Sequence, residues 1–375
     1  MAIKKLDYSQ RSLAFISLAL GFLVIWTAVL AGVLVSQTLK EEGIAKQTNG
    51  LFIIHEDIGK ISFALGRELV STVNLLLSQG SKERESKKDL HDVTWKITDN
   101  VLRNVQERST DYVVVSVSQL LDQVQVKLKK FRSTLTSESN PYELVKFYQS
   151  VSSMLLNQCF TLDNKNKLPV PSLSYTLFIQ GMSQRFGELG LGIIYMKSDL
   201  PFNKTEYLAL RAGSTQLLSM SFHFLPRARA KWVELHQQEP SVYQVMELVA
   251  EDIFVGGQLR GRKELSKAYL DSVTEELAML LLTKEVLNTT LVSTIERLTQ
   301  STRNTLAFHM SICVVAVVAV ILCLIISICA FFRYVGQSEV NFIKFRNTSN
   351  AGCTETRDRV QIISDYDVFK PQGHL

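Results

Sequence analysis

Histidine, cysteine and acidic residues occur along this sequence, but their spacing fits none of the common catalytic or metal sites. His55-Glu56 lacks the second histidine that would complete a zinc-binding pair on one helix. No Gly-rich phosphate loop ending in Lys-Ser/Thr and no Gly-x-Ser-x-Gly element is present, and no strand precedes Gly256–Gly261, as a dinucleotide site would require. The sequence therefore predicts that the protein is not an enzyme and has no metal or cofactor.

The charge and the cysteine content indicate which partners and which kind of fold to expect. The net charge of +5 over 375 residues is small, and no Lys/Arg cluster with interleaved aromatic residues occurs, so we expect no nucleic-acid binding. Three of the five cysteines lie in one apolar run and one in the C-terminal tail, which leaves Cys159 alone in the middle. Because a lone cysteine cannot form a disulfide within its own domain, helix packing must hold this region together.

Two apolar segments, Leu13–Val35 and Met310–Phe332, organise the chain. Each is long enough to cross the ~30 Å hydrocarbon core of a lipid bilayer as a helix. The first exceeds the ~7–15 apolar residues usual in a signal peptide, which predicts an uncleaved anchor, with a cleaved signal as the alternative. Lys and Arg residues lie on the N-terminal side of the first run and on the C-terminal side of the second. The positive-inside rule therefore predicts that both termini are cytoplasmic.

This topology predicts a plasma-membrane protein in five parts. The parts are a cytoplasmic N-terminus at 1–12, a transmembrane helix at 13–36, an extracellular domain at 37–308, a second transmembrane helix at 309–332 and a short cytoplasmic tail at 333–375. Sequons in the outer domain predict N-glycosylation at Asn203 and Asn288.

Helical periodicity through 37–308 predicts an all-α fold, with long up-down helical bundles between the two transmembrane helices. Proline, glycine and other turn residues separate predicted helices at 37–78, 86–137, 140–161, 172–197, 204–224, 240–254 and from 263 onward. A kink or a short break is expected at Tyr112–Val117, where β-branched residues gather. Asp163–Pro171, with its two prolines, is the predicted hinge loop between two sub-bundles.

The first two predicted helices differ in their apolar faces. The helix at 37–78 has two, separated by a narrow polar stripe, which is typical of a helix packed on both sides. The stripe comprises Glu56, Lys60, Arg67 and Asn74. The helix that follows has a single apolar stripe, which we expect to face the core. Its members are Leu90, Val93, Ile97, Val101 and Val105.

Four segments of the middle region resemble, in order, the nitrate- and nitrite-sensing (NIT) domain. This domain is a helical ligand-binding module of bacterial sensors and of some animal receptor guanylate cyclases. The segments are Leu65–Gly80, Leu90–Asp99, Phe131-Arg132 followed by Val145–Tyr148, and Met182–Tyr207. The resemblance covers residues 50–300. It implies packed helical bundles with a ligand pocket between long helices, usually in a dimer.

The resemblance also implies a ligand site, because the anion binders of this family use arginines. Arg67 matches the first arginine position. The family has a second arginine a few residues after the glycine matched by Gly187, whereas this chain has Glu188 there and Arg185 half a turn before the glycine. A guanidinium group is a planar fork that suits a flat oxyanion such as nitrate. The alternative is that Arg67 is an exposed or ion-paired surface residue.

We therefore expect a membrane-anchored, receptor-like glycoprotein that senses nitrate, nitrite or another small anion or metabolite and signals through its transmembrane helices. It would act as a homodimer or as a heterodimer with a related receptor. The alternative function is a ligand-free accessory or decoy subunit, a truncated relative of the NIT-bearing receptor guanylate cyclases. Those receptors continue into kinase-like and cyclase domains, whereas this chain stops about forty residues after its second apolar run.

Overall fold

The computed structural model describes residues 2–78, 81–109, 115–136, 138–166 and 170–366, and within these ranges the chain is helical with no strand. The helices are α1 (Ala2–Leu76), α2 (Ser81–Ser109), α3 (Val115–Thr134), α4 (Pro141–Asn166), α5 (Val170–Lys197), α6 (Lys204–Phe224), α7 (Pro226–Gln238), α8 (Pro240–Val255) and α9 (Lys263–Tyr366). The predicted all-α fold is confirmed.

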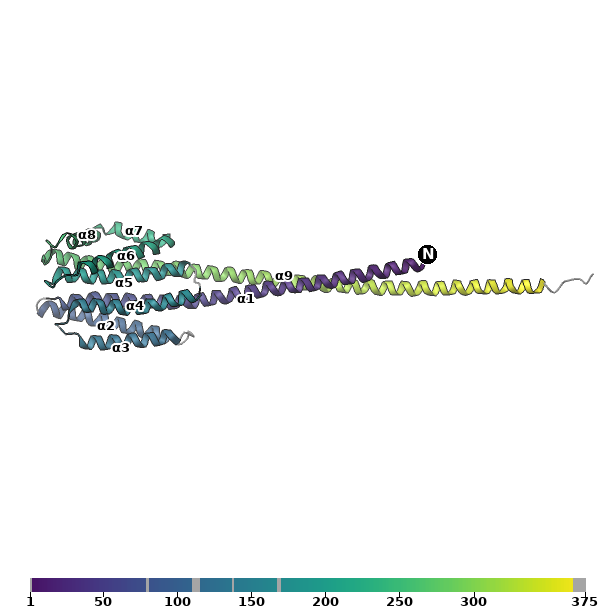
Figure 1. Ribbon diagram of the computed structural model, residues 1–375, viewed down its shortest axis with the longest axis horizontal. Helices are drawn as coiled ribbons and strands as arrows, with labels where there is room; N and C mark the ends of the chain where they lie inside the picture. The colour runs from purple at the N-terminus through teal and green to yellow at the C-terminus, as the bar shows by residue number, and fades with distance from the viewer. Residues whose placement is uncertain (1, 79–80, 110–114, 137, 167–169, 367–375) are drawn as a thin grey trace, which may run out of the picture. The chain divides into compact units, whose positions relative to one another are not determined.

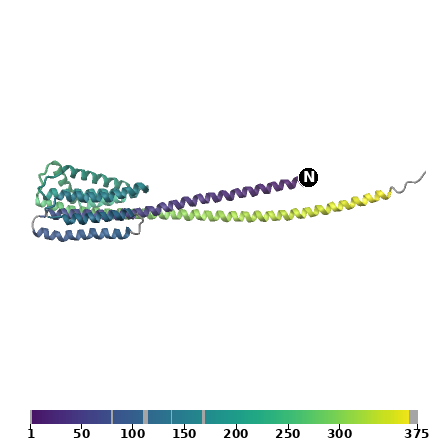
Figure 2. The same cartoon turned by 60° about the horizontal axis from the view of Figure 1, so that its bottom comes forward.

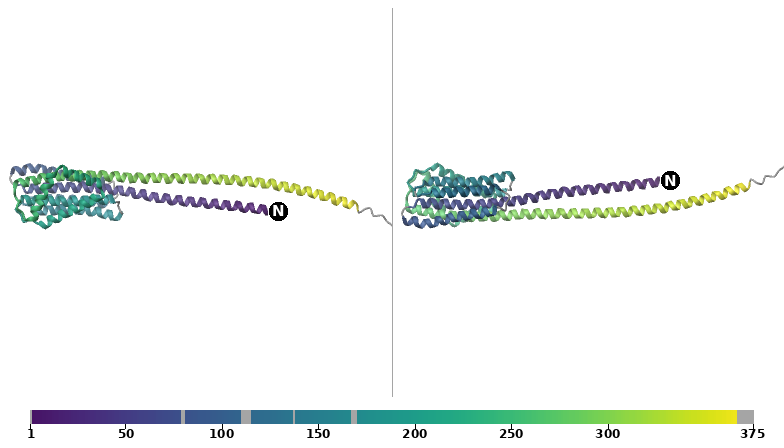
Figure 3. Two further views of the ribbon diagram at one scale, coloured as in Figure 1. Left: turned by 90° about the horizontal axis from the view of Figure 1, so that it is seen from above. Right: turned by 90° about the horizontal axis from the view of Figure 1, so that it is seen from below.

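The helices belong to two units, and α1 and α9 contribute to both. Residues 41–302 form one unit, and residues 1–40 with 303–375 form the other. In the first unit, Figure 1 shows α5 and α9 between α6, α7 and α8 on one side and α1 to α4 on the other. Figures 2 and 3 show these helices running lengthwise, with the connecting loops at the two ends. This arrangement is an up-down bundle.

Within the bundle, α1 packs on two sides, as its sequence predicts. Both apolar faces are buried, and Ile58 and Leu65 on one face and Phe63 on the other are all below a tenth exposed. The polar stripe through Lys60 and Arg67 is only half-buried. The predicted helical wheel of this segment is therefore correct.

The central element of the bundle is α5, which is buried around nearly its whole circumference from Ser172 to Met196. Such a helix is expected when the apolar residues do not form a single stripe. Two glycines let neighbouring helices approach closely. A Cβ atom on Gly66 of α1 would lie 1.9 Å from the Phe186 ring of α5, and one on Gly192 of α5 would lie 1.9 Å from the Tyr269 hydroxyl oxygen of α9.

Replacing Gly66 with alanine is expected to destabilise the bundle by up to about 2 kcal/mol. Alanine favours a helix over glycine by about 1 kcal/mol, but the added methyl group must displace Phe186, whose ring is buried and packs edge-on against Phe63 at 5.7 Å. Overpacking of this kind costs about 1–3 kcal/mol. Urea unfolding followed by circular dichroism measures the change.

Gly50→Ala is the matched control on the same helix. Nothing lies within 4 Å of a Cβ atom at Gly50, so only the helix-propensity gain operates and the variant should be as stable as the parent or more so. Equal effects of the two substitutions would contradict the close packing of α1 on α5.

The expected core face of α2 is wrong in part. Leu90 and Val93 are 57% and 49% exposed, whereas Val105 is buried as predicted. The face turned inward is instead rich in small polar residues. It comprises His91, Thr94, Thr98, Leu102 and Val105. The Thr98 hydroxyl reaches the Ala64 carbonyl of α1 at 3.5 Å, and small side chains allow this approach.

Several predicted boundaries also change. Residues 226–238 form α7, because Pro226 occupies its first turn, where proline is favourable, rather than breaking a helix. The predicted loop Asp163–Pro171 is shorter, since α4 extends through Asn166 and α5 begins at Val170. Of the expected break at Tyr112–Val117, residues 112–114 lie outside the described residues, and residues 115–117 are the helical start of α3. Asn140 caps α4, accepting a hydrogen bond from the Tyr142 amide at 3.0 Å.

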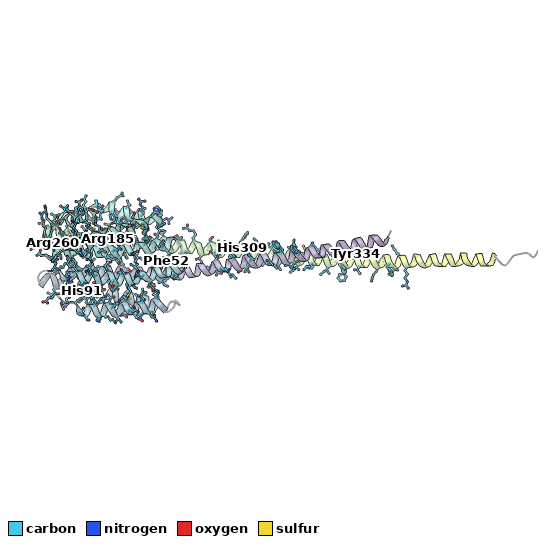
Figure 4. All side chains as sticks on the ribbon, in the orientation of Figure 1. Phe52, His91, Arg185, Arg260, His309 and Tyr334 are labelled. Atoms are coloured by element: carbon cyan, nitrogen blue, oxygen red, sulfur yellow. The ribbon has the colours of Figure 1, made fainter. Side chains whose placement is uncertain are left out.

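The second unit contains the apolar segments of α1 and α9. By length and composition, helical stretches within Gly21–Gly43 and Lys263–Lys344 are apolar enough to cross a membrane. Large apolar side chains such as Trp26 and Phe332 point outward from them. A polar contact joins the two helices at His309, which Figure 4 labels, where Thr38 Oγ1 lies 3.0 Å from His309 Nδ1. The Thr38 hydroxyl donates to the Leu34 carbonyl, so in this contact it accepts a hydrogen bond from the Nδ1–H tautomer of His309.

Candidate functional site

Arg67 lies in a groove of about 930 Å³ between α1, α2, the end of α5 and the start of α9. The α1 side of the groove carries Arg67, Ser71 and Asn74, which share one helix face because they are spaced by four and three residues. Cationic side chains outnumber carboxylates along the walls. The cations are Arg67, Lys197, Lys263 and Lys267, and the carboxylates are Asp199 and Asp271.

The Arg67 guanidinium is half-buried and makes no hydrogen bond or ion pair with any residue that the structure describes. Its neighbour across the groove, Lys197, donates a hydrogen bond to Asn74 Oδ1 at 2.8 Å. Arg67 thus brings a guanidinium, with five N–H donors in a fixed plane, to the lining of a groove with an excess of positive charge. This arrangement suits a small planar oxyanion, which could accept two parallel hydrogen bonds from one guanidinium.

Glu68, the next residue, is fully buried and is the centre of a cluster joining α1, α2, α3 and α4. Its two carboxylate oxygens accept hydrogen bonds from Nε and Nη2 of Arg132 at 2.8 and 2.6 Å. The Tyr148 hydroxyl donates to Glu68 Oε1 at 2.5 Å, and Arg132 Nη1 donates to Asp99 Oδ1 at 2.7 Å. The Arg132 guanidinium also lies over the ring of Trp95, 5.0 Å from its centroid. Glu68, Arg132, Asp99 and Tyr148 thus form one connected hydrogen-bond network, beside which the buried Trp95 Nε1–H has no partner among the described residues.

The burial and pairing of Arg132 and Tyr148 shift the pKa values of both side chains. Burial alone would lower the pKa of the Arg132 guanidinium, but its hydrogen bonds to Glu68 and Asp99 outweigh that effect and raise the pKa. Burial and the adjacent Glu68 carboxylate raise the pKa of Tyr148 well above its usual value of 10.0. Both side chains therefore hold fixed protonation states at neutral pH, as a framework requires.

A second buried cluster contains Arg185 and joins α5, α6, α8 and α9 (Figure 4). Arg185 Nη1 donates to both carboxylate oxygens of Glu188 at 2.7 Å, and Nε donates to Glu276 Oε1 at 3.0 Å. Arg211 of α6 donates to Glu188 Oε1 at 3.0 Å and to Glu247 Oε1 at 2.5 Å. Burial opposes the charge of Arg185, yet Glu188 and Glu276 raise its pKa.

The two predicted ligand residues therefore lie in different surroundings. Arg67 lines the groove described above with its guanidinium unpaired by described residues, whereas Arg185 lines a separate groove and is held by two glutamates. The predicted glycosylation sites differ as well. Asn203 is exposed at the start of α6 and caps that helix, while Asn288 is half-buried within α9.

Sequence reasoning missed the partners of these arginines. The signal for one of them was available, because Arg185 and Glu188 are three residues apart on a helix that is otherwise apolar, and a buried charge must be paired. Glu68 and Arg132 are 64 residues apart, and nothing in the local sequence connects them. Among the described residues, no group of three or more His, Cys, Asp or Glu side chains could hold a metal ion.

Comparison of the chain with family models, with curated proteins and with solved structures finds no match. The NIT resemblance therefore stays a prediction from the four sequence segments.

Proposed function

We propose that this protein is a membrane-anchored receptor that binds a small oxyanion, such as nitrate or nitrite, in the groove lined by Arg67. The observation that carries this proposal is the half-buried guanidinium of Arg67, which has no described partner in a groove of net positive charge. An unpaired, partly desolvated guanidinium is costly to maintain, and an anionic ligand would remove that cost.

The position of the groove supports a signalling role. Arg67 and Asn74 on one wall belong to α1, and Lys267 and Leu277 on another belong to α9. These two helices also contain the apolar segments. A ligand that contacts both helices can favour one packing of α1 against α9 over another, to the extent that its affinity for the two arrangements differs. The shift would then pass along both helices to the membrane.

Arg67→Met is expected to abolish nitrate binding while leaving the stability of the bundle within about 0.5 kcal/mol of the parent, because no described residue depends on this guanidinium. Isothermal titration of the 375-residue chain in lipid nanodiscs with nitrate and nitrite measures the affinity, and urea unfolding measures the stability. Arg103→Met is the matched control, since Arg103 is exposed on α2 outside the groove. Absence of saturable binding by the parent chain would refute the proposed ligand class.

A second candidate function is an accessory subunit of a related receptor. The observation that favours it is the outward-facing apolar stripe of α2, where Leu90 and Val93 are exposed. Replacing both with glutamine should then prevent co-purification of a related receptor chain from native membranes. Recovery of the protein with no related chain would count against this candidate.

N-glycosylation tests the proposed topology independently of any ligand. We expect a glycan at Asn203, whose side chain is exposed, and none at Asn288, whose carboxamide oxygen is enclosed in the middle of α9. In a eukaryotic membrane preparation, peptide N-glycosidase should shift the parent chain and the Asn288→Gln variant on a gel, and leave Asn203→Gln unshifted. A parent chain that carries no glycan would contradict an extracellular 37–308 domain.

A further inference from the structure

A second groove, of about 1000 Å³, lies between α6, α7, α8 and α9, and one of its walls is a row of neighbouring aromatic rings, tilted or edge-on to one another. Trp232 of α7 lies 5.7 Å from the Phe222 ring and 4.2 Å from the His236 ring, measured between centroids. The His236 ring is 6.1 Å from that of Tyr243 on α8. Aromatic faces carry negative electrostatic potential, so a wall of this kind favours an apolar or cationic group.

Facing these rings is Glu276 of α9, which is only 1% exposed. Its Oε1 accepts the hydrogen bond from Arg185 Nε, but its Oε2 receives none from the described residues, and its closest charged neighbour there is Nε2 of His236 at 3.9 Å. A carboxylate oxygen with little access to water is stabilised by a charged hydrogen-bond donor. The groove therefore offers this oxygen as an acceptor to a ligand.

The tautomer of His236 adds a second acceptor at the same point. Nδ1 lies 2.9 Å from the Trp232 carbonyl oxygen. A carbonyl oxygen can only accept, so in the neutral form of the imidazole the proton is on Nδ1 and Nε2 carries a lone pair. Two acceptors, His236 Nε2 and Glu276 Oε2, thus face each other across 3.9 Å. A donor with positive charge would satisfy both.

The charge balance of the surrounding cluster is also negative. Three carboxylates, Glu188, Glu247 and Glu276, are paired with only two guanidinium groups, Arg185 and Arg211. The remaining cationic side chain on the groove, Arg229, is exposed, so its charge is screened by water. One further positive charge beside Glu276 would make the net charge of the cluster zero.

We propose that this groove binds a protonated organic amine. Its ammonium group donates to Glu276 Oε2 and His236 Nε2, and its apolar or aromatic body packs against Trp232 and Phe222. A volume of about 1000 Å³ is sufficient for a metabolite-sized ligand. The site shares no lining residue with the Arg67 groove. Amine binding here and anion binding there can therefore be tested independently.

The test uses the 375-residue chain in nanodiscs at pH 8, titrated calorimetrically with phenethylammonium and tryptammonium. 2-Phenylethanol, which lacks the charge but keeps the ring, is the matched ligand. We expect saturable binding of at least one amine, and at least about tenfold weaker binding of the alcohol, as loss of a charge-assisted hydrogen bond would give. Absence of binding by both amines, or equal binding of amine and alcohol, would overturn the proposal.

Two variants locate the site. Glu276→Gln keeps the Oε1 acceptor for Arg185 but removes the charge, and Trp232→Leu removes the central ring of the wall. Each should weaken amine binding at least about tenfold. Glu234→Gln, on the exposed face of the same α7 helix, should leave it unchanged. If Glu276→Gln fails to fold, the amine affinity of Trp232→Leu alone tests the location of the site. Amine affinity undiminished in Trp232→Leu would refute the site.

Discussion

Glu68→Ala is expected to lower the free energy of unfolding by about 3–5 kcal/mol, because it leaves Arg132 buried without its main counter-charge. Arg132 would keep only its hydrogen bond to the half-exposed Asp99, and the hydroxyl of the fully buried Tyr148 would lose its acceptor. Four helices meet at this carboxylate, so the loss should appear as destabilisation of the whole bundle. Urea unfolding followed by circular dichroism gives the value.

A triple variant tests whether charge burial, rather than loss of packing, causes the effect. Glu68→Leu with Arg132→Met and Tyr148→Phe removes every polar group at once, and replacing a buried ion pair by apolar residues is often close to neutral. We expect it to regain most of the stability that Glu68→Ala loses. Glu234→Ala, which breaks an exposed ion pair with Lys231, should cause no measurable change. A Glu68→Ala variant as stable as the parent would contradict the network.

Arg185→Met is the second substitution with a large expected effect, about 3–5 kcal/mol of lost stability. Glu276 would lose its hydrogen bond from Arg185, and Glu188 would keep only Arg211 and Ser214 as partners. The same urea unfolding assay measures the loss.

This experiment also decides between two roles for Arg185. The sequence resemblance implies an anion ligand, whereas its two glutamate partners indicate a framework residue. A framework role predicts a destabilised Arg185→Met variant, in contrast to a stable Arg67→Met. If Arg185→Met instead retains full stability and loses only nitrate affinity, the glutamate cluster is not what holds this part of the bundle.

Much of the fold follows from local sequence. Periodicity places both faces of α1 correctly, and Asn140 with Pro141 predicts the start of α4. The orientation of α2 does not follow, because His91, Thr94 and Thr98 face inward to fit beside α1 and the Arg132 cluster, and apolar periodicity alone favours Leu90 and Val93. Side-chain size and distant partners decide such a helix face, and neither is visible within one helix.

The two candidate grooves also differ in how much of them local sequence predicts. The position of Arg67 away from both apolar faces of α1 is predictable from the polar stripe. The positive surroundings of its guanidinium are not, because Lys197 and Lys267, which line the same groove, belong to other helices. The ring wall near Glu276 brings together residues 222 to 276 from four helices, and their spacing in the sequence matches no motif.

The central position of α5 has a consequence for how the protein is made. The apolar faces of α1 are complete once Leu76 has been synthesised, but α5, which packs against them, begins only at Val170, 94 residues later. At about 5–20 residues per second, that interval is on the order of ten seconds. During it, Phe63 lacks the Phe186 ring of α5 that packs against it. The packing of the α1 face that α5 covers therefore stays incomplete until the middle helix has been synthesised.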